Sequence, residues 1–246
     1  MKRGLIFVCA LALAGCGETA ENAERARAEI EKSVLNDLRP GDILFRRGGG
    51  LTSRAVLAVD AEGIYSHTGI VVSEGPGDEK GPGGTEGSGD SEGPGSTERS
   101  GDSEVPGAAG SAKFTVVHLV PGETGGDVIK RETIGEFFSR ERALKGAVMR
   151  LKGADDPLGT EAGLAGSAAR EALRLSATTL MFDHAYDLDD TTRMYCTELV
   201  WQVFRRQGVD LTGGRRTKIN MPGFNGLYIL PTDIARNPQL ELVYSF

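Results

Sequence analysis

The segment YCTELVWQVFRRQG, residues 195–208, decides the fold that the sequence predicts. Its apolar residues recur at helical spacing: Leu199, Val200, Val203 and Phe204. The run ends in Gly208, as helix C-termini commonly do, and the polar stretch 189–192 precedes it with residue types that cap helices. The segment therefore predicts an amphipathic helix with Cys196 in its first turn.

Two interpretations of Cys196 follow from this position. The unpaired N–H groups and the positive dipole of a helix N-terminus favour thiolate over thiol, which is the form a nucleophile needs. Alternatively, Cys196 only fills space beside Leu199, because unpaired cysteine is among the most buried residue types. The helix alone leaves both interpretations open.

The composition suits one ordinary domain with appendages. The chain has 246 residues, of which 39% are hydrophobic, and this is enough for a substantial core. The net charge is −7, and the segment 74–113 alone holds nine acidic residues against three basic ones. The remainder is nearly neutral, so no basic surface for nucleic acid is expected.

The first residues predict export and a lipid anchor. Lys2 and Arg3 precede a short apolar run that ends in Leu13-Ala14-Gly15-Cys16, which resembles the bacterial lipobox. The resemblance implies a lipoprotein signal peptide at 1–15, a lipidated Cys16 that binds the membrane, and a tether with a short helix at 16–37. An ordinary signal with a chance cysteine is the alternative. Gly17 after Cys16 implies the periplasmic side of the outer membrane in a Gram-negative cell envelope.

Cysteine usage then favours a function for Cys196. Cys9 leaves with the signal and Cys16 is acylated, so one thiol remains in the mature chain and has no disulfide partner. A lone free thiol in an oxidising compartment is a liability unless it is buried or used.

Residues 38–246 predict one α+β domain. Strands are expected at 42–45, 65–73, 114–120, 147–151, 227–230 and 240–246, and helices at 52–59, 133–142 and 160–179. Asn220 to Gly226 is expected to be a loop and 231–233 a turn. The acidic, Gly-rich segment 74–113 lacks aromatic residues and predicts a disordered insertion at a hairpin tip.

The hairpin around this insertion brings two histidines together. If Ser73 pairs near Phe114, position 67 faces position 120, and His67 and His118 become diagonal neighbours on one face. Their Cα atoms would then be roughly 7–8 Å apart, whereas a slip of one residue would separate them. Two histidines and a cysteine are the parts of a thiol hydrolase.

Five motifs in chain order sharpen this interpretation: Gly41-Asp42-Ile43-Leu44-Phe45, Tyr65-Ser66-His67-Thr68-Gly69-Ile70-Val71, Tyr186-Asp187-Leu188, Tyr195-Cys196-Thr197-Glu198-Leu199-Val200-Trp201 and Leu230-Pro231-Thr232-Asp233-Ile234. In this order they resemble the YiiX/YaeF-like (YebB-like) group of circularly permuted NlpC/P60 papain-like enzymes. The resemblance implies an antiparallel sheet packed against the cysteine-bearing helix. It also fits His67 preceding Cys196, the reverse of the unpermuted order.

The resemblance implies roles for three residues. Cys196 matches the nucleophile, His67 matches the base, and His118 matches the polar residue that orients the base. Many YiiX-like members carry glutamate at the third position, whereas the related acyltransferase-like proteins carry histidine. An ordinary polar residue on a half-exposed strand is the alternative for His118.

The other candidates receive structural interpretations. His184 matches no family position and is expected on the surface, and Glu198 and Trp201 are expected to pack or to contact substrate. No CxxC or HxxxH spacing is present, so neither a metal nor another cofactor is expected.

The resulting hypothesis is an envelope-anchored cysteine hydrolase with a Cys-His-His site. It would cleave an amide, isopeptide or acyl-ester bond through an acyl-enzyme, in a peptidoglycan peptide or an acylated lipid. The alternatives are an acyltransferase on a lipid or N-acyl substrate, and a non-catalytic lipoprotein binding module.

Overall fold

The computed structural model describes residues 35, 37–74, 113–122, 128–154, 163–190, 192–222 and 224–246. The expected signal at 1–15, nearly all of the tether at 16–37 and the interior of the insertion at 74–113 lie outside the described residues. None of the helices within the described residues is long and apolar enough to cross a membrane.

The described residues form strands with five helices between them. They are β1 (Ile43–Arg47), α2 (Leu51–Val59), β2 (His67–Glu74), β3 (Lys113–Val120), β4 (Val128–Thr133), α3 (Ile134–Phe137), β5 (Lys145–Leu151), α4 (Leu164–Ser176), β6 (Met181–Phe182), β7 (Arg193–Met194), α5 (Cys196–Arg205), β8 (Thr217–Met221), β9 (Phe224–Tyr228), α6 (Pro231–Ala235) and β10 (Leu240–Ser245).

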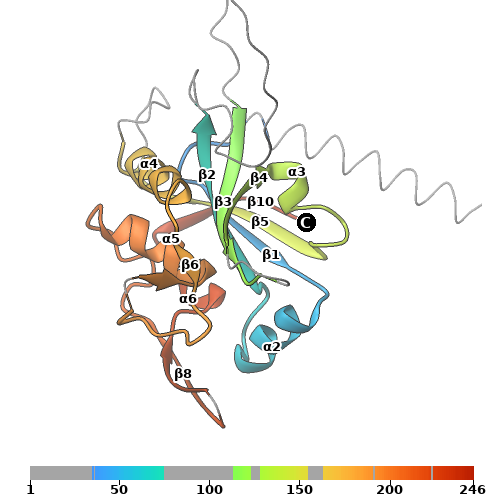
Figure 1. The fold of residues 1–246 in the computed structure, drawn as a ribbon. Coiled ribbons are helices and arrows are strands. Elements are labelled where there is room, and N and C mark those ends of the chain that lie inside the picture. The colour runs from blue at the N-terminus through green and yellow to red at the C-terminus, as the bar shows by residue number, and fades with distance from the viewer. Residues whose placement is uncertain are drawn as a thin grey trace, which may run out of the picture.

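Six of these strands form one antiparallel sheet in the order β10-β5-β1-β2-β3-β4 (Figure 1). The short strands β6 and β7 pair with each other, and β8 and β9 form a separate hairpin. The expected α+β class is therefore confirmed.

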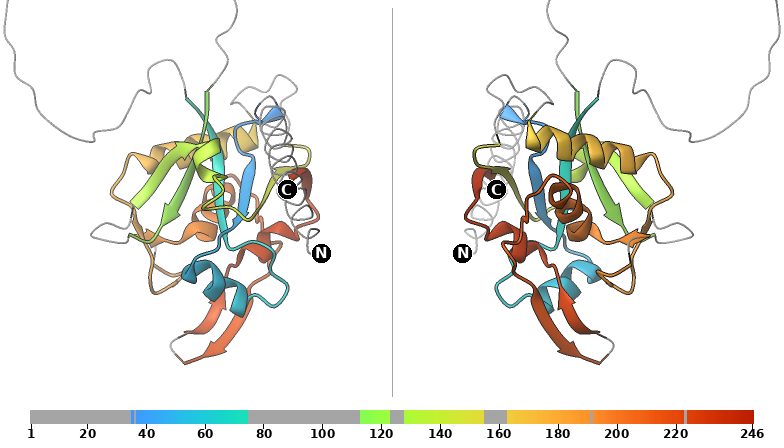
Figure 2. Two further views of the ribbon diagram at one scale, coloured as in Figure 1. Left: turned by 90° about the vertical axis from the view of Figure 1, so that its right-hand side faces the viewer. Right: turned by 90° about the vertical axis from the view of Figure 1, so that its left-hand side faces the viewer.

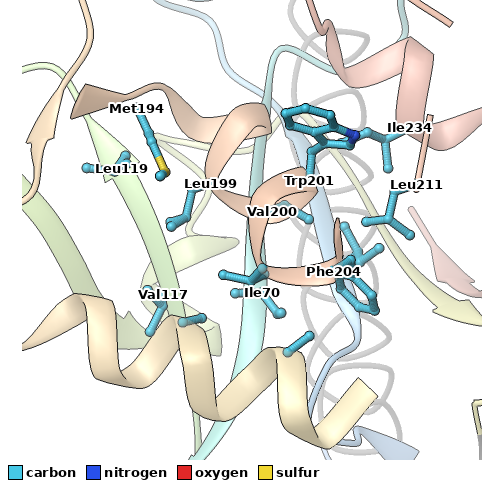
Figure 3. Packing of buried hydrophobic residues seen from close by; sticks show 14 of the residues in the cluster. Ile70, Val117, Leu119, Met194, Leu199, Val200, Trp201, Phe204, Leu211 and Ile234 are labelled. Atoms are coloured by element: carbon cyan, nitrogen blue, oxygen red, sulfur yellow. The ribbon is translucent and has the colours of Figure 1, made fainter. Parts of the chain in front are cut away.

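Helices cover both faces of the sheet. On one face, α4 and α5 pack against β2 and β3, and alternate strand residues such as Ile70 and Val117 meet Leu199 and Phe204 (Figure 3). On the other face, α3 closes a smaller core in which Phe137 is fully buried (Figure 2). Burial of alternate residues on both faces explains the nearly continuous apolar runs of the central strands.

The cysteine-bearing helix forms as predicted, with one correction at its start. Its apolar positions are buried, and the chain leaves the helix through Gly208, whose φ is +85°. The residue that caps it is Tyr195, and no described side chain supplies a capping hydrogen bond, so the expected cap from 189–192 is wrong. The first N–H groups of α5 are thus not taken by a cap.

Three other expectations differ from the structure. Residues 231–235 form helix α6 instead of a turn, because Pro231 suits a first helical position and Asp233 accepts the Leu230 N–H. The expected loop at 220–226 lies within the β8–β9 hairpin. The capping box of Thr133 and Glu136 is present, but α3 ends at Phe137.

Gly41 and Asp42 fix the start of the sheet. Gly41 has a φ of +91°, and a Cβ there would lie 2.4 Å from the carbonyl oxygen of Ala165 on α4. Asp42 is buried and accepts two hydrogen bonds of 2.8 Å from the guanidinium of Arg150 on β5. These contacts explain why a glycine and an aspartate open this strand.

We expect Gly41→Ala to destabilise the domain by about 3 kcal/mol, from the left-handed φ and from overlap with backbone atoms of α4 that cannot turn away. Gly153→Ala is the matched control, because Gly153 also has a positive φ but a Cβ there would meet nothing within 4 Å. That variant should lose only about 1 kcal/mol. Urea unfolding measures both, and equal losses would contradict the assigned role of close packing at Gly41.

Candidate active site

The two histidines predicted to lie together do so. Ser73 pairs with Phe114 in the β2–β3 ladder, which is the predicted register. Nε2 of His67 lies 2.8 Å from Nδ1 of His118, and the rings meet edge to face. Gly69 makes this possible, because a Cβ there would lie 3.2 Å from Cβ of His118 and 2.5 Å from Val116.

A carboxylate that the sequence analysis missed lies behind His118. Nε2 of His118 is 2.9 Å from Oε1 of Glu132 on β4. His118 pairs with Lys130 in the β3–β4 ladder, so Glu132 is its diagonal neighbour on the same face. The available signal was the β-branched pair Val128-Ile129 followed by the polar residues 130–133, which is compatible with a strand once it is placed beside β3.

Two guanidinium groups hold Glu132. Arg142 donates to Oε2 at 2.7 Å, and Arg46 lies 3.6 Å from Oε1. Burial alone would raise the pKa of Glu132, but the contacts with His118 and Arg142 outweigh it and lower the pKa to about 2. Glu132 is therefore ionised at neutral pH and can only accept hydrogen bonds.

This fixed charge assigns the proton positions in both rings. Because Glu132 only accepts, Nε2 of His118 carries the proton and Nδ1 of His118 accepts. Nε2 of His67 must then donate to that nitrogen, which leaves Nδ1 of His67 as the lone-pair nitrogen. The arrangement leaves His67 with one nitrogen that is able to accept a proton.

Both imidazoles are neutral in the resting site. Burial lowers the pKa of His67 well below its ordinary value, and the charge of Arg46 acts in the same direction. Burial also lowers the pKa of His118, although Glu132 opposes the shift. The ring of Phe137 lies against both histidines and under Arg46, which keeps solvent from this side.

Cys196 is the first residue of α5 and is held by its neighbours in the sequence. The Tyr195 hydroxyl accepts the N–H of Ile229 at 2.9 Å, and the Thr197 hydroxyl donates to the carbonyl of Ile229 at 2.6 Å. The two bonds tie the start of the helix to the segment after β9. They explain why tyrosine and threonine flank the cysteine in the motif.

Cys196 and His67 open onto one pocket. Cys196 and His67 both line a cavity of about 260 Å³ between α2, the β8–β9 hairpin and the start of α5. The thiol of Cys196 is partly exposed there and lies next to Thr68, the residue that follows His67. The structure therefore brings together all three residues that the sequence singled out, from β2, β3 and α5.

The expected depression of the Cys196 pKa is not found. Burial raises the pKa of the thiol, and it outweighs the opposing backbone N–H groups of Thr68 and Thr197 and the charge of Arg46. The helix N-terminus is present, but the surrounding apolar walls are the larger effect. The resting site therefore holds a neutral thiol and a neutral imidazole.

The remaining sequence candidates lie away from the pocket lining. His184 is exposed and packs against Phe182, as expected for a surface residue. Trp201 is buried and donates to Asp210. Glu198 is fully buried, and burial together with the nearby charge of Asp183 raises its pKa to about 8.

Comparisons with known proteins identify the fold. No protein-family model and no curated protein matches the sequence. Solved structures do match, and one of them is described as the metalloprotein YiiX from Escherichia coli O157:H7. It is 17% identical, the match covers 85% of this chain and 97% of that chain, and the TM-score is 0.55. The expected resemblance to YiiX is thus confirmed at the level of the fold.

A metal site does not fit the residues that the structure describes. Among them, no group of three or more His, Cys, Asp or Glu side chains is placed to hold a metal ion. The two histidines direct Nε2 of His67 and Nδ1 of His118 at each other, and Nε2 of His118 is engaged by Glu132. The proposed cysteine chemistry therefore uses only groups of this chain.

The raised pKa of Cys196 predicts how the thiol reacts with iodoacetamide. We expect the labelling rate at Cys196 to rise with pH through 9.0, the ordinary thiol value, with no plateau near neutrality. Peptide mass spectrometry separates Cys196 from the other two cysteines, and glutathione gives the reference profile. A plateau below pH 7 that disappears in His67→Ala would show a preformed ion pair and contradict this prediction.

The lowered pKa of Glu132 predicts a pH-dependent stability. Ionised Glu132 stabilises the folded state, because the folded state binds the proton of this carboxyl less readily than the unfolded chain does. This stabilisation is fully present above pH 4.5, the ordinary pKa of the group, and it is lost as the pH falls towards about 2. The shift corresponds to about 3 kcal/mol. Glu132→Gln should remove this dependence, whereas Glu141→Gln, at an exposed position of the same region, should keep it. Urea unfolding between these pH values is the measurement, and parallel curves for wild type and Glu132→Gln would contradict the assignment.

Proposed function

We propose that this chain is a cysteine hydrolase of the circularly permuted NlpC/P60 papain-like type, which cleaves an amide, isopeptide or acyl-ester bond. One observation carries the proposal. Glu132, His118 and His67 form a line of directed contacts, and His67 and Cys196 line the same pocket. A nucleophile, a base and groups that orient the base are the parts of such a site.

The order of the motifs supports the permuted type. His67 lies on an early strand and Cys196 on a late helix, whereas an unpermuted papain-like enzyme has its cysteine helix first. The fold likeness to YiiX is consistent with this arrangement. A binding module would have no need of a thiol that shares its pocket with a histidine oriented through a buried carboxylate.

In the first step, Nδ1 of His67 takes the thiol proton as Sγ of Cys196 attacks the carbonyl carbon of the substrate. The resulting imidazolium is stabilised through His118, whose Nε2 lies 2.9 Å from Oε1 of ionised Glu132. The backbone N–H of Cys196, at an end of α5 that no described side chain caps, is suited to hold the oxyanion.

In the second step, the bond to the leaving group breaks and that group takes the proton from Nδ1 of His67. This leaves a thioester on Cys196. His67 then removes a proton from water, the hydroxide attacks the thioester carbonyl, and the carbon–sulfur bond breaks with return of a proton to the thiol. Transfer to an acceptor other than water would use the same thioester.

We also propose that the enzyme works in the cell envelope, held to a membrane through lipidated Cys16. The support is the sequence Leu13-Ala14-Gly15-Cys16 after a short charged and apolar start. Several acyl chains on one cysteine give a stable anchor. Metabolic labelling with a clickable fatty acid, lost in Cys16→Ser, would support the anchor.

Removal of the nucleophile tests the proposed hydrolase. With p-nitrophenyl acetate as a generic reporter, we expect Cys196→Ala and His67→Ala each to lower kcat/KM by at least about a thousandfold. The midpoint of thermal unfolding should stay nearly unchanged for Cys196→Ala. Mass spectrometry of the wild type should detect an acetyl group on Cys196.

The matched control is His184→Ala, which removes an exposed histidine outside the pocket and should retain full activity. Full activity in Cys196→Ala would refute the hydrolase assignment. Absence of any Cys196-dependent turnover or acylation in the folded wild type would favour the binding module instead.

A further inference from the structure

Thr68 directly follows His67 on β2, and its side chain points to the opposite face of the sheet. That face packs against α5, where Ile70, two residues further along the strand, lies in one core with Leu199 (Figure 3). Thr68 is fully buried there, next to Cys196 at the start of the helix. It therefore meets the thiol from the sheet, on the side away from solvent.

The hydroxyl of Thr68 has no nitrogen or oxygen partner among the residues that the structure describes. A buried hydroxyl without a partner costs stability, and most buried polar atoms in proteins avoid this state. The neighbour to which it can donate is the sulfur of Cys196, and the sulfur of a neutral thiol is only a weak acceptor. The hydroxyl is therefore poorly satisfied in the resting site and gains a strong acceptor when the sulfur becomes charged.

The backbone N–H of Thr68 also points at the sulfur. Val71 donates its N–H to the carbonyl of Asp42 beside β1, so the N–H of Thr68, three residues earlier, lies on the opposite edge of β2. The ladder between β2 and β3 begins at Ile70, two residues after Thr68. The N–H of Thr68 is directed at Cys196 instead of at a strand partner.

We infer that Thr68 is a catalytic residue whose hydroxyl and backbone N–H both donate to Sγ of Cys196 while that sulfur is negatively charged. The inference rests on the proposed hydrolase function and adds a residue to its reacting centre. As the thiol proton passes to Nδ1 of His67, the electron pair of the S–H bond stays on the sulfur, where the two donors stabilise it. When Sγ bonds to the acyl carbon, the charge moves to the carbonyl oxygen.

The two donors act more strongly on the charged sulfur than on the neutral thiol. Hydrogen bonds to charged groups are roughly twice as strong as those between neutral groups, so Thr68 lowers the energy of the charged state relative to the resting site. Both contacts lower the pKa of the Cys196 thiol and oppose the burial that raises it. Thr68 thus offsets part of the cost that the apolar walls impose on charge at the sulfur.

Removal of the hydroxyl tests the inference through the reactivity of the thiol, which does not depend on turnover. Thr68→Val keeps the shape of the side chain and the backbone N–H but removes the O–H donor. We expect iodoacetamide to label Cys196 of the full-length protein about threefold more slowly at about pH 8. A roughly tenfold smaller thiolate fraction would be partly offset by a more nucleophilic thiolate. Peptide mass spectrometry measures the rate at Cys196.

Thr115→Val is the matched control. Thr115 is also buried, its hydroxyl also lacks a partner among the described residues, and it pairs with Val72 on the face of the sheet that packs against the helices. The same substitution there should leave the labelling of Cys196 unchanged. The midpoint of urea unfolding should equal or exceed that of the wild type in both variants, because each removes a buried hydroxyl without a partner.

Two further variants keep the test decisive if Thr68→Val alters the fold. Thr68→Ser keeps the hydroxyl and should label at nearly the wild-type rate, whereas Thr68→Ala should label as slowly as we expect for Thr68→Val. Equal labelling rates in the wild type and in the variants without the hydroxyl would overturn the inference.

Turnover separates this inference from the hydrolase proposal. With p-nitrophenyl acetate, Thr68→Val should lower kcat/KM by about tenfold, far less than the loss of Cys196, and Thr115→Val should leave it unchanged. If the wild type shows no turnover while Thr68→Val still slows labelling, the hydrolase proposal fails and the contact of Thr68 with the charged sulfur stands. Turnover in the wild type together with equal labelling rates would overturn the role of Thr68 alone.

Discussion

The ion-paired carboxylate of Glu132 is the interaction on which the rest of the site depends. Arg142 and Arg46 keep it charged, and its charge determines which nitrogen of each histidine carries a proton. A neutral residue at this position would leave His118 free to adopt either tautomer, and Nδ1 of His67 would no longer be fixed as the lone-pair nitrogen. Histidine at the third position is therefore compatible with the proposed cysteine chemistry, because the carboxylate lies behind His118 on β4.

Sheet register and helix packing bring this line to the thiol. His67, His118 and Glu132 lie on three neighbouring strands, so a slip of one residue in either ladder would turn a member to the opposite face. Cys196 is far from these strands in the sequence. It reaches the site because the apolar side of α5 packs on β2 and β3 (Figure 3). Long-range packing, which no local pattern specifies, thus completes the site.

The sequence predicted the parts of the fold that strong local patterns encode. The β2–β3 register followed from pairing Ser73 with Phe114, α5 followed from its periodicity, and α4 followed from its alanine-rich composition. Glu132 was missed because β4 is short and its mixture of charged and β-branched residues defines a strand only beside β3. The two interpretations of Cys196 could not be decided from sequence, because the helix terminus can be read there, whereas the burial that raises the pKa of the thiol depends on tertiary packing.

The neutral resting state and the apolar pocket have the same physical origin. The apolar walls make it costly to separate charge between Cys196 and His67, so no ion pair forms in advance. Charge then develops only when a carbonyl lies beside the thiol and the first N–H groups of α5. Displacement of water from the pocket strengthens the interaction of that developing charge with the backbone. The resting protonation state of the site is thus a consequence of its apolar lining.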